Sequence, residues 1–142
     1  MKAFFATKRL AFGSAIKTWS HVEKLEAQGI THVINLRCIH NRKVQHFEHV
    51  WLPFKDNAQP RPRSFYVCAL KFYRKAMKKP HAKVFVMCRH GVCRSASLTY
   101  FLLRSSGVSP NKTEAKIRRA RPNIRIARAY RESGEEFLRL SW

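Results

Sequence analysis

The stretch from Val84 to Ser95 constrains the fold of this chain most strongly, because it joins an apolar run to a helical pattern through a Cys-x5-Arg sequence. Val84 to Met87 has the length and composition of a buried β-strand. After Ser95, apolar residues recur at helical spacing: Leu98, Phe101 and Leu102. The residues between the two patterns therefore run from a strand end into a helix N-terminus, where backbone N–H groups point outward and bind anions.

The residue types in this loop fit phosphoryl transfer through a covalent intermediate. A helix N-terminus and the flanking Arg89 and Arg94 should favour the reactive thiolate of Cys88. Attack on a phosphate ester would give a phosphocysteine, held by loop amides and by a bidentate Arg94 guanidinium. Gly91 would let the backbone approach the anion closely, and Ser95 would hydrogen-bond the sulfur. We therefore expect Cys88, Arg94 and Ser95 to be catalytic, and the phosphate to be bound by the residues of the loop: Arg89, His90, Gly91, Val92, Cys93 and Arg94.

The loop resembles the Cys-x5-Arg loop of the cysteine-based protein tyrosine phosphatases, and its context is most similar to their compact dual-specificity branch. Residues 10–16 and 25–37 resemble that family's opening strand, first helix and following strand. Residues 51–57 resemble its mobile general-acid loop, and Arg121-Pro122 followed by Tyr130 resembles its closing helices. Low-molecular-weight phosphatases and arsenate reductases carry the loop near the N-terminus instead. The resemblance implies a protein phosphatase acting on phosphoprotein substrates, chiefly on phosphotyrosine, and on phosphoserine and phosphothreonine if the cleft is shallow.

Two positions leave other functions open. Met87 stands where the family usually has a His that orders the loop and helps to hold the thiolate, so a non-catalytic phosphate-binding module is one alternative. The order Cys88-x-His90-Gly91 resembles the branch that removes phosphates from RNA 5′ ends, although that branch usually has Asn and Thr where this chain has Cys93 and Ser95. A polynucleotide 5′-phosphatase is therefore the second interpretation.

Asp56 is the predicted general acid. It is the only Asp in the chain, and the seven Glu residues mostly lie on helical patterns. Asp56 lies between Pro53 and Pro60, in a loop that could deliver a proton to a leaving oxygen. The alternative is that Asp56 and Asn57 only begin a turn.

The cysteines indicate a reducing compartment rather than a metal site. None of Cys38, Cys68, Cys88 and Cys93 has Cys-x2-Cys spacing, so we expect no metal and no cofactor. Cys93 could capture an oxidised Cys88 as a disulfide or be a small residue turned away from the anion, and Cys68 is predicted to lie in the core. A thiol nucleophile requires a reducing compartment, and the chain has no run of eighteen apolar residues and no signal-peptide core. We expect an intracellular, cytoplasmic protein without a transmembrane segment.

Charge is the second strong signal in the sequence. Twenty-nine Lys and Arg residues against eight acids give a net charge of +21. The segment from Arg104 to Arg131 holds nine basic residues and one acid, Glu114. This segment is predicted to bind RNA or another polyanion, unless it is only the solvated face of basic helices.

The order of patterns predicts an α/β fold with a mostly parallel central sheet flanked by helices, a three-layer α/β/α arrangement, in a single domain over residues 1–142. The predicted elements are an opening strand within 10–16, a helix capped by Ser20 with Glu23, strands Thr31 to Arg37 and His49 to Leu52, a helix from Ser64 to Lys79, the strand Val84 to Met87, a helix from Ser95, a helix between Pro110 and Arg121, and a closing helix.

Overall fold

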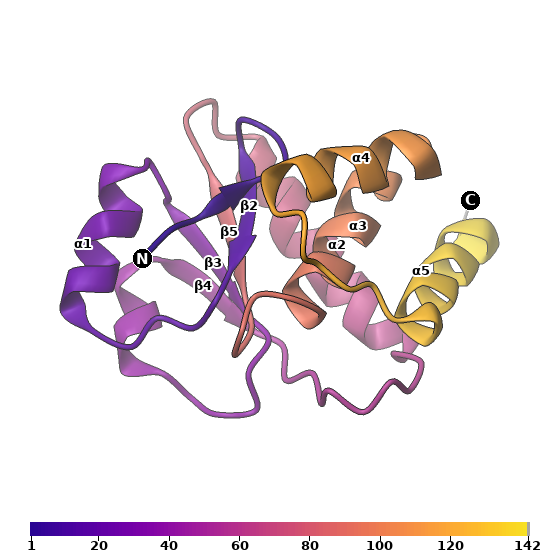
Figure 1. The fold of residues 1–142 in the computed structure, drawn as a ribbon, viewed down its shortest axis with the longest axis horizontal. Helices are drawn as coiled ribbons and strands as arrows, with labels where there is room; N and C mark the ends of the chain where they lie inside the picture. The colour runs from indigo at the N-terminus through magenta and orange to yellow at the C-terminus, as the bar shows by residue number, and fades with distance from the viewer. Residues whose placement is uncertain (142) are drawn as a thin grey trace.

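The computed structural model describes residues 1–141, which form a five-stranded sheet between two layers of helices (Figure 1). The strands are β1 (Phe4–Phe5), β2 (Leu10–Gly13), β3 (His32–Asn35), β4 (Glu48–Trp51) and β5 (Val84–Met87). The helices are α1 (Trp19–Ala27), the 3-10 helix η1 (Arg42–His46), α2 (Arg63–Met77), α3 (Arg94–Ser105), α4 (Pro110–Ala120) and α5 (Arg128–Ser141).

The sheet has the order β1-β2-β5-β3-β4, so β5 is the central strand. Strands β2, β5, β3 and β4 run parallel, and only β1 pairs antiparallel, with Phe4 opposite Phe12. The mostly parallel sheet is therefore confirmed. The antiparallel edge strand was not predicted, because two residues are too short a run to show a periodicity.

Apolar clusters on the two faces of the sheet account for the three layers. One cluster joins α1 and η1 to the sheet through Val22, Leu25, Val44 and Phe47. The other joins α2, α3, α4 and α5 to the opposite face, and α3 is its most deeply buried helix. Each residue of β5 is fully buried, as expected for a parallel strand covered on both faces. The α/β/α architecture is confirmed.

Two local predictions are wrong. The N-cap of α1 is Thr18, whose side chain accepts a hydrogen bond from the His21 N–H at 3.1 Å, while Ser20 already lies in the first turn. Cys68 is exposed rather than in the core. The buried side chains of α2 centre on a stripe through Tyr66, Ala69 and Tyr73, and position 68 falls outside that stripe.

Candidate active site

The carboxyl ends of the four parallel strands lie in one row, which places the segments that follow them at a common edge of the sheet. Gly13 pairs with Met87, Met87 with Asn35, and Asn35 with Trp51. After Met87, residues 88–93 turn into α3, whose first residue is Arg94 (Figure 1). The predicted passage from strand through loop to helix N-terminus is therefore present, and we name residues 88–94 the catalytic loop.

Cys88 lies at the floor of the catalytic loop with its sulfur already hydrogen-bonded. Its side chain is buried, the Gly91 N–H donates to Sγ at 3.2 Å, and the thiol donates to Ser95 Oγ at 3.3 Å. Ser95 is fully buried, and its carbonyl accepts a bond from Thr99 Oγ1 at 2.8 Å. The structure thus brings Cys88, Gly91 and Ser95 together as predicted. In the ionised state of the sulfur, both neighbours can act as donors to a thiolate.

Gly91 is required by the crossing of the catalytic loop over the end of β2. Its φ is +70°, and a Cβ there would lie 2.5 Å from Gly13 C and 2.6 Å from Ser14 N. The Cys88 N–H donates to the Gly13 carbonyl at 3.2 Å, and the Ala15 N–H donates to the Arg89 carbonyl at 3.3 Å. The loop is therefore held against the end of β2 by two backbone hydrogen bonds, and a glycine allows this close approach.

Arg94 is placed to bind an anion. Its Nη1 donates to the Phe54 carbonyl at 2.8 Å, and none of the carboxylates in residues 1–141 forms an ion pair with it. The side chains of Arg89 and His90 are exposed, and Val92 and Cys93 are half-buried. A half-buried guanidinium with unused donors beside a helix N-terminus can hold the oxygens of a phosphate.

Arg121 braces the catalytic loop from outside and was not recognised as a site residue from the sequence. Its Nη1 donates to the carbonyls of His90 at 3.1 Å and Gly91 at 2.9 Å, and its guanidinium lies 4.6 Å from the Phe4 ring centroid. In a trans peptide the carbonyl and the next N–H point in opposite directions. Holding the His90 carbonyl outward therefore directs the Gly91 N–H inward, where it meets the Cys88 sulfur.

Asp56 lies in the exposed loop between β4 and α2, which we name the acid loop (residues 52–62). The Tyr130 hydroxyl accepts a hydrogen bond from the Ala58 N–H at 2.8 Å and lies 3.4 Å from Asp56 Oδ1. The buried Phe54 packs edge-on against the Tyr130 ring, with centroids 4.6 Å apart. Tyr130 therefore holds the acid loop from α5. The sequence indicated only that Tyr130 lies in the closing helices, and nothing in it pointed to a contact between Tyr130 and the acid loop.

Cys93 of the catalytic loop is influenced by its burial and by the acid loop. Burial raises the pKa of the Cys93 thiol, and the negative charge of Asp56 raises it further. The acid loop also meets the catalytic loop directly, because Arg94 Nη1 donates to the Phe54 carbonyl, two residues before Asp56. No hydrogen bond joins Asp56 to Cys88 in the described part of the chain. A raised pKa leaves little thiolate at Cys93, which favours the interpretation of Cys93 as a small structural residue over a redox partner.

Met87 is fully buried in the apolar cluster that covers the α1 face of the sheet. A polar ring at this position would need a hydrogen-bond partner within that cluster. The ordering of the loop therefore depends on the other contacts described here: the Gly91 N–H, Ser95 Oγ and the Arg121 guanidinium.

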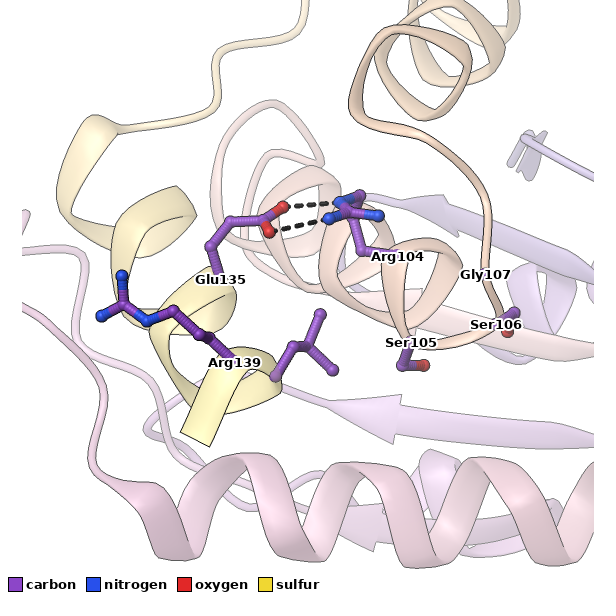
Figure 2. A pocket seen from close by; sticks show the side chains of 7 residues that line it. Arg104, Ser105, Ser106, Gly107, Glu135 and Arg139 are labelled. Atoms are coloured by element: carbon purple, nitrogen blue, oxygen red, sulfur yellow. Dashed lines mark hydrogen bonds and ion pairs between the residues drawn. The ribbon is translucent and has the colours of Figure 1, made fainter. Parts of the chain in front are cut away.

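The basic segment from Arg104 to Arg131 is partly neutralised within the fold. A depression of about 530 Å³ lies between α3 and α5. Arg104 pairs there with both carboxylate oxygens of Glu135, at 2.6 and 2.9 Å, as the dashed lines in Figure 2 mark. Arg118 and Arg131 both pair with Glu114, and Arg128 pairs with Glu132. Of the nine basic residues, the four without a described ion pair or loop contact through the side chain are Lys112, Lys116, Arg119 and Arg125.

Two further findings concern the described residues only. No helix within residues 1–141 is long and apolar enough to cross a membrane. In the same residues, no three His, Cys, Asp or Glu side chains gather closely enough to hold a metal ion.

The family match and the similar solved structures are those of phosphatases and phosphatase-like proteins. Residues 12–133 match the family described as dual specificity phosphatase, catalytic domain. No curated protein matches the sequence. The fold is similar to that of DUSP15, with a TM-score of 0.84 and 18% identity over 98% of this chain and 88% of that one. It is also similar to a human tyrosine phosphatase-like serine/threonine/tyrosine-interacting protein, with a TM-score of 0.81 and 21% identity over 98% and 97% of the two chains. A third similar structure is PTPMT1 in complex with PI(5)P, with a TM-score of 0.80 and 17% identity over 95% and 93%. At these identities the structural likeness concerns the fold alone.

Proposed function

This chain belongs to the dual specificity phosphatase family of cysteine-based phosphatases, and we propose that it hydrolyses phosphate monoesters through a phosphocysteine at Cys88. The observation that carries the proposal is the buried Cys88 sulfur, which is hydrogen-bonded to Gly91 and Ser95. It lies at the N-terminus of α3, whose first residue, Arg94, has no carboxylate partner within residues 1–141.

In the first step the substrate phosphate binds to Arg94 and to the amides of the catalytic loop. The Cys88 thiolate attacks phosphorus, and the bond from phosphorus to the ester oxygen breaks. Asp56, protonated before the step, gives its proton to the departing oxygen. Arg94 and the loop amides stabilise the charge on the equatorial oxygens. The products of this step are an alcohol or phenol and the phosphocysteine.

In the second step water attacks the phosphocysteine and the S–P bond breaks. The Asp56 carboxylate, now deprotonated, accepts a proton from the water. Ser95 Oγ, 3.3 Å from the sulfur, donates to the departing thiolate and makes it a better leaving group. Inorganic phosphate leaves, and the thiolate and the protonated Asp56 are restored.

We propose phosphotyrosine in proteins as the principal substrate, with phosphoserine and phosphothreonine as further substrates. Support comes from the exposure of Asp56, Arg89 and His90, which indicates a shallow entrance to the catalytic loop. A shallow entrance admits short side chains as well as the longer phosphotyrosine.

The second candidate is the hydrolysis of RNA 5′ phosphates. The exposed His90 beside Gly91 favours it, and so do the cations on α4 that have no ion-pair partner within residues 1–141: Lys112, Lys116 and Arg119. These side chains could contact the phosphates of a polynucleotide.

The test is turnover of a small aryl phosphate, of phosphotyrosine and phosphoserine peptides, and of a 5′-triphosphorylated RNA, with Cys88→Ser as control. We expect the aryl phosphate and the phosphotyrosine peptide to be hydrolysed and Cys88→Ser to be inactive on every substrate. Turnover of the RNA alone would replace the first candidate by the second. Phosphate binding without turnover of any substrate would make the protein a binding module, and activity retained in Cys88→Ser would contradict the mechanism.

A further inference from the structure

Large exposed apolar side chains gather at the edge of the sheet that carries the catalytic loop. Among residues 1–141, four large hydrophobic side chains are strongly exposed: Trp19, Ile39, Trp51 and Leu140. The first three lie at the start of α1, in the loop after β3 and at the end of β4, which all meet this edge (Figure 1). Single exposed apolar residues are common on proteins, whereas a group at a functional edge indicates a binding surface.

The same edge is strongly basic. Residues 14–19, 36–45, 51–61 and 88–94 contain eight Lys and Arg residues and one acid, Asp56. No ion pair within residues 1–141 involves the four cations nearest the exposed apolar side chains in sequence, which are Lys17, Arg37, Arg42 and Lys43. These four cations and the side chains of Trp19, Ile39 and Trp51 together form what we name the active-site rim.

The rim is fixed by contacts between its loops. Lys43 Nζ lies 5.6 Å from the centroid of the Trp19 ring, and Asn41 Nδ2 donates to the Ile16 carbonyl at 2.7 Å. Trp51 Nε1 donates to the Arg37 carbonyl at 2.6 Å, which satisfies the polar atom, while the residue as a whole remains 42% exposed. The His40 ring also packs edge-on against the Trp51 ring, with centroids 5.6 Å apart, so both exposed tryptophans are held in place by neighbouring side chains, as in a preformed binding surface.

The rim lies close to the nucleophile. Trp51 stands in the same row of the sheet as Met87, separated from it by β3. Two strand spacings amount to about 10 Å. A surface that contacts the rim therefore lies beside the entrance to the catalytic loop.

We propose that the active-site rim docks on anionic phospholipid bilayers, so that Cys88 acts on phosphate esters presented at the bilayer surface. Indole rings favour the interface between headgroups and acyl chains, an aliphatic side chain favours the acyl boundary, and Lys and Arg contact anionic headgroups. The rim supplies these three kinds of side chain together. The inference rests on the proposed function, because it takes this edge as the one that presents Cys88 to substrate.

A bilayer fits the rim better than a single-stranded nucleic acid does. Bases stack on aromatic rings along a continuous basic groove. Ile39 is 60% exposed, more than either tryptophan of the rim, and has no aromatic face to offer a base. Its exposure among cations matches partial insertion into a lipid surface.

The experiment measures sedimentation of the protein with vesicles of phosphatidylcholine, with and without phosphatidylserine. We expect binding to the anionic vesicles only, weakening as salt rises. Trp19→Ser and Ile39→Ser should each weaken binding by about tenfold, because burial of one large apolar side chain is worth about that factor or more. Lys17→Gln, Arg42→Gln and Lys43→Gln combined should weaken it by about 10²-fold, at about fivefold for each cation.

Matched controls lie elsewhere on the molecule. Leu140→Ser removes the fourth exposed apolar side chain, on α5, and Lys75→Gln with Lys78→Gln removes two exposed cations at the far end of α2. Both should leave vesicle binding unchanged. Ile39→Ser should also leave turnover of a small aryl phosphate unchanged, since that substrate needs no surface. Cys88→Ser should bind vesicles as the parent does, so that docking and the catalytic proposal fail separately.

Tryptophan fluorescence separates lipid from nucleic acid. Anionic vesicles should shift the emission of the parent to shorter wavelength, and Trp19→Phe should reduce that shift. The inference is overturned if the parent does not bind anionic vesicles, if the rim variants bind them as tightly as Leu140→Ser does, or if an oligonucleotide quenches the rim tryptophans while vesicles leave the emission unchanged.

Discussion

The catalytic loop and the acid loop meet at the same edge of the sheet, but they are held in different ways. The catalytic loop has the buried Cys88, a glycine with φ of +70° and backbone hydrogen bonds to the end of β2 and the residue Ala15 after it. The acid loop begins with two backbone hydrogen bonds to the end of β3, from the Leu52 and Phe54 N–H groups, but its residues 55–60 are all exposed and are held by the Tyr130 hydroxyl. The proposed nucleophile is therefore held by more contacts than the proposed acid.

Arg94 connects the two loops. The guanidinium that would bind phosphate also donates to the acid loop at 2.8 Å. Phosphate binding and the position of Asp56 are therefore coupled through one side chain. Substitutions in the two loops should therefore differ in their effects on the reaction rate and on the free energy of unfolding.

Among substitutions that leave Cys88 in place, the largest effect on rate is expected from the acid loop. Asp56→Asn removes the proton donor and should lower kcat by about 10²–10⁴-fold on alkyl phosphates. Aryl phosphates with very good leaving groups should lose much less, because their oxygen departs without a proton. Steady-state kinetics on both substrate types give the result. An equal loss on the two would indicate that Asp56 has a structural role only.

Arg94→Lys tests the side chain shared by the two loops. An ammonium cannot reproduce the planar fork of the guanidinium, so kcat/KM should fall by about 10²–10³-fold. The loss should be similar for good and poor leaving groups, in contrast to Asp56→Asn. A variant with nearly parental kcat/KM would show that Arg94 does not bind the phosphate.

Gly91→Ala tests the rigidity of the catalytic loop. The left-handed backbone costs a Cβ residue about 1–2 kcal/mol, and the overlap with Gly13 adds about 1–3 kcal/mol. The free energy of unfolding in urea should therefore fall by about 2–5 kcal/mol. Gly107→Ala is the matched control, because Gly107 also has a positive φ but nothing lies within 4 Å of its Cβ position. An equal loss in the two variants would show that the close crossing over β2 adds nothing to the cost of a Cβ at position 91.

Tyr130→Phe should have the smallest effect. Loss of the hydroxyl leaves the Ala58 N–H without its acceptor and loosens the acid loop, which should lower kcat by about threefold to tenfold, given about 0.5–1.5 kcal/mol for one hydrogen bond. The loss should again be larger for poor leaving groups. Tyr100→Phe is the control: its hydroxyl donates to Glu135, away from both loops, so kcat should stay unchanged. A parental kcat in Tyr130→Phe would show that Tyr130 does not position the acid.

The sequence predicted the parts of the site whose contacts are local along the chain. The run from Val84 to Ser95 carries strand, loop and helix in consecutive residues, so the surroundings of Cys88, Gly91 and Ser95 could be inferred from it. The braces supplied by Arg121 and Tyr130 could not, because they arrive from residues more than thirty positions away and depend on how α4 and α5 pack. The pair of Arg104 with Glu135 was missed for the same reason, since it forms only across two packed helices. The pairs Arg118–Glu114 and Arg128–Glu132 are four residues apart on one helix, a spacing that the sequence does show.

The role of Cys88 as nucleophile is the central claim, and the most direct test is mass spectrometry of the enzyme quenched with acid during turnover of an aryl phosphate. The account predicts one phosphoryl group on the peptide that contains Cys88, and none on that peptide in Cys88→Ser. Turnover by the parent protein with no phosphorylated peptide, or with the group on Cys93 or His90 instead, would contradict it.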